Sequence, residues 1–214
     1  PDSGVLVVAG DRIIDPTVLE QLFAVFYTKH CDLAMLATPA QDHSRQGRIV
    51  SLDGGDVLGI VEYADIRQRL TYRKLLERIT DEATPSREQL TETIMQTFAG
   101  EGPVPSDAKF EKAFGPLWQA LAVEQKPLSA SQLRELIPAE YTRFSFTSPD
   151  GETVLKSPEE VDASAWLNTS VYVVRLGALQ AGLRHLNRNN AQQEEYLSDI
   201  AGYLAETPRE DGRS

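Results

Sequence analysis

The sequence predicts an α/β protein with a mostly parallel main sheet and an all-helical insertion. Two apolar runs, residues 5–9 and 33–37, flank an amphipathic helix expected over residues 16–29, which is the order of a β-α-β unit. Both runs are apolar at almost every position, as in strands that helices cover on both faces. Amphipathic helices then follow a hairpin, and strands return after them. We therefore expect a three-layer sheet interrupted by a helical insertion.

The composition excludes several classes of protein before any motif is considered. The 214 residues are 41% hydrophobic and 25% charged, as in a globular protein with one substantial core. Asp and Glu number 32 against 21 Lys and Arg, and this net charge of −11 repels a phosphate backbone, so we expect no nucleic-acid partner. Cys31 is the only cysteine, which fits a reducing compartment, and we expect the cytoplasm. No apolar run approaches the roughly 18 residues of a membrane span, so no membrane partner is expected.

The first third of the chain has clear start and turn signals. Asp15 is placed to cap the helix that Pro16 begins. After a polar loop, two strands expected at residues 48–52 and 57–63 flank the turn sequence Asp-Gly-Gly-Asp at 53–56, which predicts a β-hairpin. We assign residues 1–66 to the α/β core.

The middle of the chain changes character. Helical segments separated by Pro and Gly are expected at residues 66–79, 86–98, 106–123 and 129–137. Three of them carry an apolar stripe, made by Leu70, Leu75, Leu76, Ile79, Leu90, Ile94, Phe98, Phe110, Phe114, Leu117, Trp118 and Leu121. Such stripes can enclose a small core, so we expect residues 67–138 to fold as a satellite bundle. This insertion could act as a lid or as a homo-oligomer contact.

The last third returns to the α/β core, at residues 139–214. Short strands are expected at 143–147 and 153–155 around the turn Ser-Pro-Asp-Gly at 148–151. A last strand is expected at 167–174, and two helices at 176–188 and 193–206.

Polar residues at strand ends are the candidates for a site. Asp11 follows the first strand, where open α/β sheets bind ligands, and is a suitable Mg²⁺ ligand, although a turn Asp is the simpler interpretation. Glu62 ends a hairpin strand and could accept hydrogen bonds from sugar hydroxyls, or lie in solvent; Gly47 would let a ligand approach the backbone. Asn168 opens the last strand and offers a donor and an acceptor, or makes an Asx turn.

A fourth motif, residues 189–200, reads NNAQQEEYLSDI. Taken alone it is a polar loop before a helix with an acidic first turn. It resembles the "NNAQGEYYLTDI" signature of the uridylyltransferase domain of bifunctional N-acetylglucosamine-1-phosphate uridylyltransferase/glucosamine-1-phosphate acetyltransferase. Residues 193, 195 and 198 differ from that signature, which indicates a distant relative.

The resemblance assigns roles to the other three motifs, which follow in the family's order. It implies a nucleotide-diphospho-sugar transferase fold of the glycosyltransferase A type, and Mg²⁺ bound with the help of Asp11. Gly47 and Glu62 match the family's "YGRI…GIVE" hairpin, which contacts N-acetylglucosamine. Asn168 and Thr169 match its sugar-binding "NTG" step, with Ser170 in place of Gly. The implied ligand is a sugar 1-phosphate or a nucleotide sugar, and the implied reaction is uridylyl transfer from UTP in the synthesis of cell-envelope precursors.

The departures from the family limit this hypothesis. The Gly-rich "LAAGxGTRM…PK" loop, the "QPxGTAxA" segment and the late metal-binding Asn have no match here. We therefore expect a fragment of a sugar-1-phosphate nucleotidyltransferase that carries the sugar-binding half of the site and is inactive alone, because no remaining loop would stabilise the triphosphate charge. The alternative is a non-catalytic relative that acts as a scaffold and binds a protein through the helical insertion.

Overall fold

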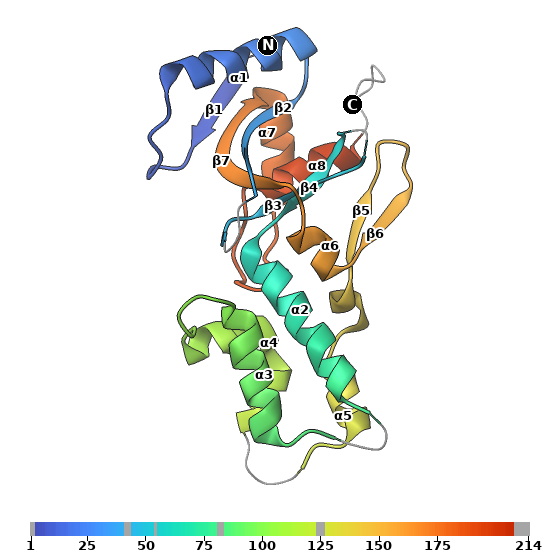
Figure 1. Cartoon of the computed structure of the whole chain (residues 1–214). Coiled ribbons are helices and arrows are strands. Elements are labelled where there is room, and N and C mark those ends of the chain that lie inside the picture. The colour runs from blue at the N-terminus through green and yellow to red at the C-terminus, as the bar shows by residue number, and fades with distance from the viewer. Residues whose placement is uncertain (1–2, 41–43, 54, 81–83, 123–126, 208–214) are drawn as a thin grey trace.

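The computed structural model describes residues 3–40, 44–53, 55–80, 84–122 and 127–207. One sheet contains β1 (Gly4–Val8), β2 (Leu33–Pro39), β3 (Arg48–Ser51), β4 (Val57–Val61) and β7 (Trp166–Arg175). It forms the upper part of the molecule, and the helices of the middle of the chain form the lower part (Figure 1). Gly54 of the expected hairpin turn and Val123 of an expected helix lie outside the described residues.

The prediction of a mostly parallel sheet is wrong: every strand pair in the described residues is antiparallel. β1 and β2 run in the same direction, but β7 lies between them and pairs with both, through Val5 and Leu33 opposite Val174. Helices cover both faces of the sheet around β7. The strands there are therefore apolar on both faces, as the strands of a parallel sheet usually are. Apolar runs therefore could not distinguish the two directions. The chain is an α/β protein, and the glycosyltransferase A type of fold stays a prediction.

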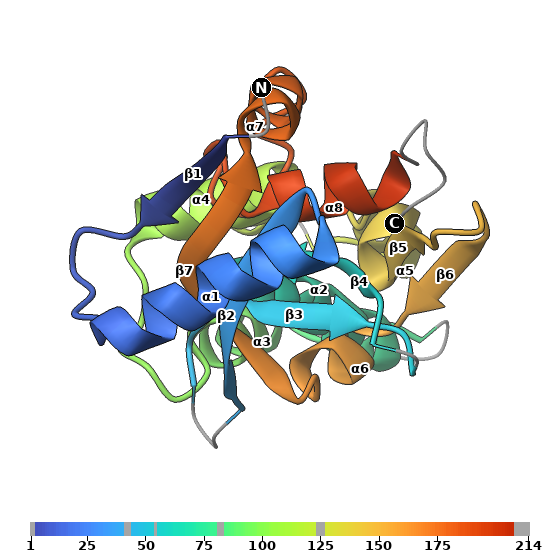
Figure 2. The same ribbon diagram turned by 90° about the horizontal axis from the view of Figure 1, so that it is seen from above.

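One edge of β7 is shared by two strands that leave a break between them. β1 pairs with residues 171–175, while β3 pairs only with Leu167 and Trp166. Because β2 occupies the other edge along nearly the full strand, β1 and β3 follow one another on the same edge. Residues 168–170 of β7 therefore lie at a break in the sheet. Seen from above, the helix of residues 16–29 crosses in front of β7 (Figure 2).

Helices cover the two faces of β7, as expected for three layers. Val171 and Val173 pack against α1 (Pro16–Lys29), with Phe26 fully buried between the layers. Tyr172 and Val174 face the opposite side, where α7 (Leu176–Leu183) and α8 (Asp199–Glu206) lie. The helix start at Asp15 is confirmed, since its carboxylate accepts a hydrogen bond from the backbone of Thr17.

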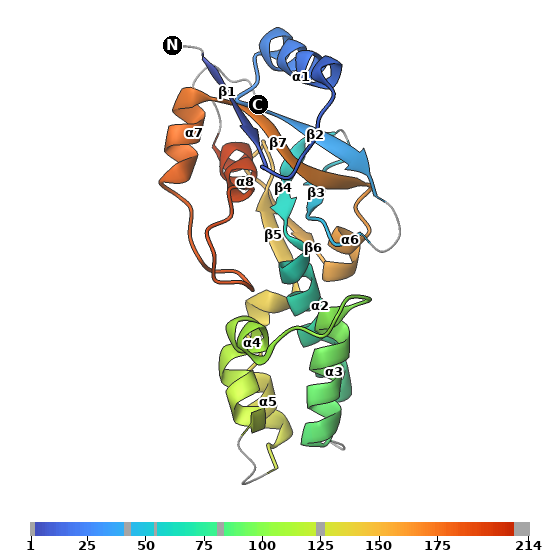
Figure 3. The same cartoon turned by 90° about the vertical axis from the view of Figure 1, so that its left-hand side faces the viewer.

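The helices of the middle of the chain gather in the lower part of the molecule (Figure 3). They contain a second hydrophobic cluster. It is formed by α2 (Tyr63–Arg78), α3 (Arg87–Ala99), α4 (Asp107–Ala122) and α5 (Ala130–Glu135). Most of the predicted stripe residues lie in this cluster, but Leu70 packs instead with the sheet residues Val50 and Leu58. Helix α2 thus belongs to both cores and connects them. The domain boundaries at 66/67 and 138/139 stay a prediction.

The return segment differs from the prediction at several places. The hairpin of β5 (Phe144–Thr147) and β6 (Thr153–Lys156) is confirmed, but the structure adds a 3₁₀ helix at Ala139–Thr142 and α6 at Pro158–Asp162. The last two helices are shorter than expected. Residues 193–198 precede the last helix instead of starting it, because Gln193 has a φ of +53° and Asn190 exchanges two hydrogen bonds with the backbone of Glu194. No helix in the described residues has the length and apolarity to cross a membrane.

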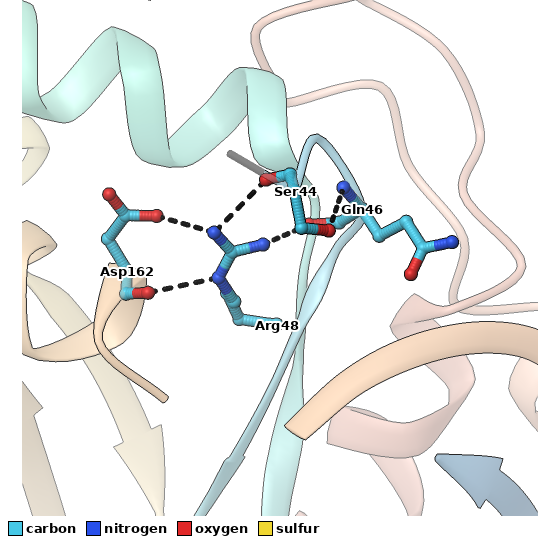
Figure 4. Close-up of polar contacts among 4 residues, drawn as sticks. All are labelled: Ser44, Gln46, Arg48 and Asp162. Atoms are coloured by element: carbon cyan, nitrogen blue, oxygen red, sulfur yellow. Dashed lines mark hydrogen bonds and ion pairs between the residues drawn. The ribbon is translucent and has the colours of Figure 1, made fainter. Parts of the chain in front are cut away.

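A buried arginine fixes the segment that enters β3. Arg48 is 6% exposed and pairs with Asp162 at 2.9 Å, at the end of α6 (Figure 4). It also donates to the backbone oxygens of Ser44, Gln46 and Asp162 at 2.7–3.2 Å. A buried guanidinium must use its donors in this way, because unpaired ones carry a large desolvation penalty. The contacts hold residues 44–47 in one place beside the break in the sheet.

Removing this guanidinium tests its structural role. We expect Arg48→Met to lower the free energy of unfolding by on the order of 3 kcal/mol in urea denaturation, because it leaves Asp162 and three carbonyls without their donor. Arg73→Met is the matched control: Arg73 pairs with Glu159 at 2.6 Å, but both side chains are exposed, so the loss should stay below about 1 kcal/mol. Equal losses for the two variants would contradict the structural role.

Candidate functional site

A pocket of about 330 Å³ opens at the break between β1 and β3. We call it the gap pocket. It is lined by Val7, Val8, Ala9, Glu62, Asn168, Ser170, Tyr172, Glu195, Tyr196, Leu197 and Ser198. Four separate segments therefore meet here: the end of β1, the end of β4, the middle of β7, and the loop before α8. Two of the sequence-predicted residues, Glu62 and Asn168, come together in this pocket.

Asn168 is held with its carbonyl oxygen turned inward. That oxygen accepts a hydrogen bond from the backbone N–H of Ser170 at 2.9 Å and one from the hydroxyl of Tyr172 at 2.7 Å. The first bond is the Asx turn that the sequence left as an alternative. Because a backbone N–H can only donate, the contact also settles which amide atom is the oxygen. The NH₂ group of Asn168, a residue that is 4% exposed, takes part in neither bond.

Tyr172 supports this orientation. Burial raises the pKa of its hydroxyl above the ordinary value, and the nearby Glu62 carboxylate adds to the shift. The hydroxyl therefore keeps its proton at neutral pH and remains a donor to Asn168. Nothing in the apolar pattern of the strand separates Tyr172 from an ordinary core residue, so the sequence did not indicate this role.

Glu62 is held from two sides. Its Oε1 accepts a hydrogen bond from the hydroxyl of Ser198 at 2.7 Å. Its Oε2 lies against Gly47, where a Cβ atom would come within 3.0 Å of that oxygen. Gly47 also accepts a hydrogen bond from the backbone N–H of Asn168 at 2.9 Å. The glycine therefore makes room for the carboxylate of Glu62, and it connects the two predicted residues through its backbone.

The other three predicted residues, Gly47, Thr169 and Asp11, are not among those that line the gap pocket. Thr169 lies on the opposite face of β7, as strand alternation requires, and its hydroxyl donates to the backbone oxygen of Leu36 at 2.7 Å. Asp11 lies just beyond β1; its side chain is 82% exposed and its carboxylate is 3.9 Å from Arg12. The described residues contain no group of three or more His, Cys, Asp or Glu side chains that could hold a metal ion.

Two more carboxylates lie behind Glu62, in the first turns of α2 and α8. Burial raises the pKa of Asp65 to about 6, although its hydrogen bond from the backbone of Ala191, at 2.6 Å, opposes the shift. Burial and the charge of Glu62 raise the pKa of Asp199 to about 6 as well. The hydrogen bond to Asp65 ties the 189–200 segment to α2. The sequence singled out neither Asp65 nor Asp199 as a site residue.

The backbone at two replaced glycines has a left-handed conformation. Ser170 has a φ of +59° and Gln193 a φ of +53°, a region that favours glycine. At both positions the motifs that the sequence resembles have Gly. The chain thus keeps a glycine-like backbone where its side chains depart from the pattern.

Comparison with known proteins gives one short match. No protein-family model matches the chain. Among curated proteins, it is similar to the protein named "Bifunctional protein GlmU" of Mycolicibacterium gilvum (strain PYR-GCK), with 40% identity over 62 residues. These residues are 28% of this chain, and the match spans 12% of the length of that protein. The similarity supports a relation to GlmU-type nucleotidyltransferases over a small part of the chain.

The buried carboxylates predict a specific pH dependence of stability. A pKa raised from 3.8 to about 6 means that the folded chain holds the Asp65 proton more tightly than the unfolded chain does. Its contribution to stability therefore falls as the pH rises from about 4 to about 6, and the full penalty is present above that range.

Asp65→Asn keeps an acceptor for the Ala191 N–H and removes the buried charge. We expect it to raise the free energy of unfolding by about 1–2 kcal/mol at pH 7.5, and we expect this gain to shrink at pH 5, where Asp65 itself is protonated. Urea denaturation at the two pH values measures both quantities. Asp150→Asn, in an exposed turn, controls for the loss of one surface charge. A gain for Asp65→Asn that is the same at both pH values would refute the interpretation.

Proposed function

We propose that this chain carries the sugar-binding half of a sugar-1-phosphate nucleotidyltransferase site, and that the gap pocket binds the N-acetylglucosamine part of N-acetylglucosamine 1-phosphate or its UDP derivative. The observation that carries the proposal is that Glu62 and Asn168, 106 positions apart in the sequence, line one pocket and are joined through Gly47. The similarity to a GlmU protein and the two left-handed replacements of glycine support it.

The chemistry of the gap pocket fits a hydroxylated ligand. The NH₂ group of Asn168 would donate to a hydroxyl or acetamido oxygen, and Oε2 of Glu62 would accept from a hydroxyl or amide N–H. Ser198 and Tyr172 fix these two groups before a ligand arrives, which lowers the entropy lost on binding. Val7, Val8 and Leu197 would cover the apolar parts of the ring. A volume of about 330 Å³ is in the range of small-molecule sites.

Mg²⁺ at Asp11 belongs to the same proposal. One exposed carboxylate is not a Mg²⁺ site by itself, and Mg²⁺ is usually held by one or two carboxylates together with substrate phosphates. Asp11 would therefore bind the ion only alongside a phosphorylated ligand. In the complete reaction the ion would stabilise charge on the phosphates, whereas the residues of the gap pocket orient the sugar.

Isothermal titration calorimetry with N-acetylglucosamine 1-phosphate tests the proposal. A ligand of about twenty non-hydrogen atoms at about −0.3 kcal/mol each gives a Kd on the order of 0.1 mM. Asn168→Asp keeps both acceptor bonds to Ser170 and Tyr172 but replaces the NH₂ donor, so we expect binding to weaken at least about tenfold.

Asn187→Asp is the matched control. Its side chain is exposed and also accepts from a backbone N–H, that of Asn189 at 2.8 Å, but it lies outside the gap pocket. The affinity of Asn187→Asp for N-acetylglucosamine 1-phosphate should equal that of the unchanged chain. No saturable binding to the unchanged chain, which the scaffold alternative predicts, or an equal loss in both variants would contradict the proposal.

A further inference from the structure

A second pocket, of about 380 Å³, lies on the other side of Glu62. We call it the cationic pocket, because four basic side chains line it: Arg45, Arg67, Lys109 and Lys112. Its other walls are Glu62, Tyr63, Ala64, Phe98, Pro105, Ala191, Gln192 and Glu194. Four cations face two carboxylates here, in a chain whose net charge is −11. This positively charged cluster is therefore opposite in sign to the net charge of the molecule.

The two parts of the molecule build this pocket together. Arg45 precedes β3 and Arg67 lies on α2, whereas Lys109 and Lys112 lie one turn apart on α4. The guanidinium groups of Arg45 and Arg67 each lie 5.8 Å from the ring centre of Tyr63. The Arg48 contacts that hold residues 44–47 fix the start of this arrangement.

Two glycines after α3 allow the helices to come this close. At Gly102, a Cβ atom would lie 2.5 Å from Nη1 of Arg45. At Gly100, whose φ is +59°, it would lie 2.6 Å from the hydroxyl of Tyr63 and 3.3 Å from the guanidinium carbon of Arg67. The lack of a side chain at Gly100 and Gly102 therefore leaves room for Arg45 and Arg67 to pack against the helical part.

The carboxylates in the pocket leave most of this positive charge uncompensated. Glu194 lies 3.6 Å from Lys112, and Glu62 is turned toward Ser198 and Gly47. In the described residues, no carboxylate pairs with Arg45, Arg67 or Lys109, and the buried Nε of Arg67 has no hydrogen-bond partner. Neighbouring cations without counter-charges attract an anion, and guanidinium and ammonium groups are the usual partners of phosphate oxygens.

The cationic pocket adjoins the gap pocket. Glu62 lines both, and the 189–200 segment runs between them, with Ala191, Gln192 and Glu194 on one side and residues 195–198 on the other. The hydrogen bond from Ala191 to Asp65 and the bond from Gln193 to the backbone of Lys112 hold this segment against α2 and α4. One extended ligand could therefore place a neutral part in one pocket and an anionic part in the other.

We propose that the cationic pocket binds the phosphate or diphosphate group of the phosphorylated sugar whose ring occupies the gap pocket. The choice of this ligand rests on the proposed function. The helical part, through Lys109 and Lys112, then supplies positive charge to the ligand, in addition to any role as a lid or an oligomer contact.

Titration calorimetry with three probes tests this proposal: inorganic pyrophosphate, N-acetylglucosamine, and N-acetylglucosamine 1-phosphate. In Arg45→Gln/Lys109→Gln, which removes two exposed charges from the pocket, we expect the affinities for pyrophosphate and for the sugar phosphate to fall at least about tenfold. The affinity for unphosphorylated N-acetylglucosamine should change less than about twofold. Pyrophosphate should also compete with the sugar phosphate.

Lys74→Gln/Arg184→Gln is the control, because it changes the net charge equally at two exposed positions outside both pockets. An equal loss in this variant, or unchanged pyrophosphate binding in Arg45→Gln/Lys109→Gln, would overturn the proposal. A loss of N-acetylglucosamine affinity as large as that of the sugar phosphate would also overturn it. Failure of the proposed function would give a different result. The unchanged chain would then bind pyrophosphate but neither N-acetylglucosamine nor N-acetylglucosamine 1-phosphate, and a sugar phosphate would be excluded as the ligand.

Discussion

The arrangement of the sheet depends on β7, which pairs with β1 and β2 along its two edges and then with β3 beyond the end of β1. Two strands on one edge of a longer strand leave a break, and at this break the backbone of Asn168 reaches Gly47 instead of a continuous neighbour. A break of this kind would expose unpaired backbone groups. Here the Asx turn at Asn168 and the contact from Ala9 to the backbone of Ser170 satisfy them, and the space that remains is the gap pocket.

The two ends of the break are fixed by polar contacts over long sequence distances. Arg48 ties the segment before β3 to Asp162, and Ser198 ties Glu62 to the start of α8. The polar groups in these contacts have their partners within the protein, so the pocket is formed without a ligand. The same loop before α8 borders both pockets, and α2 belongs to both hydrophobic cores. The helical part is therefore positioned relative to the sheet by the elements that also line the pockets.

Local patterns predicted the elements better than their arrangement. The cap at Asp15, the two hairpins and the apolar stripes of the helices were visible because each depends on neighbouring residues. The direction of the strands was not visible in the sequence, because it depends on β7 entering the sheet between β1 and β2. For the site, strand ends and the resemblance indicated Glu62 and Asn168. The roles of Ser198, Tyr172 and Arg45 escaped prediction, since each rests on a contact between distant segments, and strand alternation turned Thr169 away from the pocket.

The most direct test of the account is a map of ligand contacts by ¹H–¹⁵N correlation spectra of the chain, titrated with N-acetylglucosamine 1-phosphate. The account predicts saturable shifts of backbone amides around the break in the sheet, at Ala9, Gly47, Ser170 and Leu197, together with amides of α4 near Lys109. Shifts centred on another surface, such as the outer face of α1 or the β5–β6 hairpin, would contradict it.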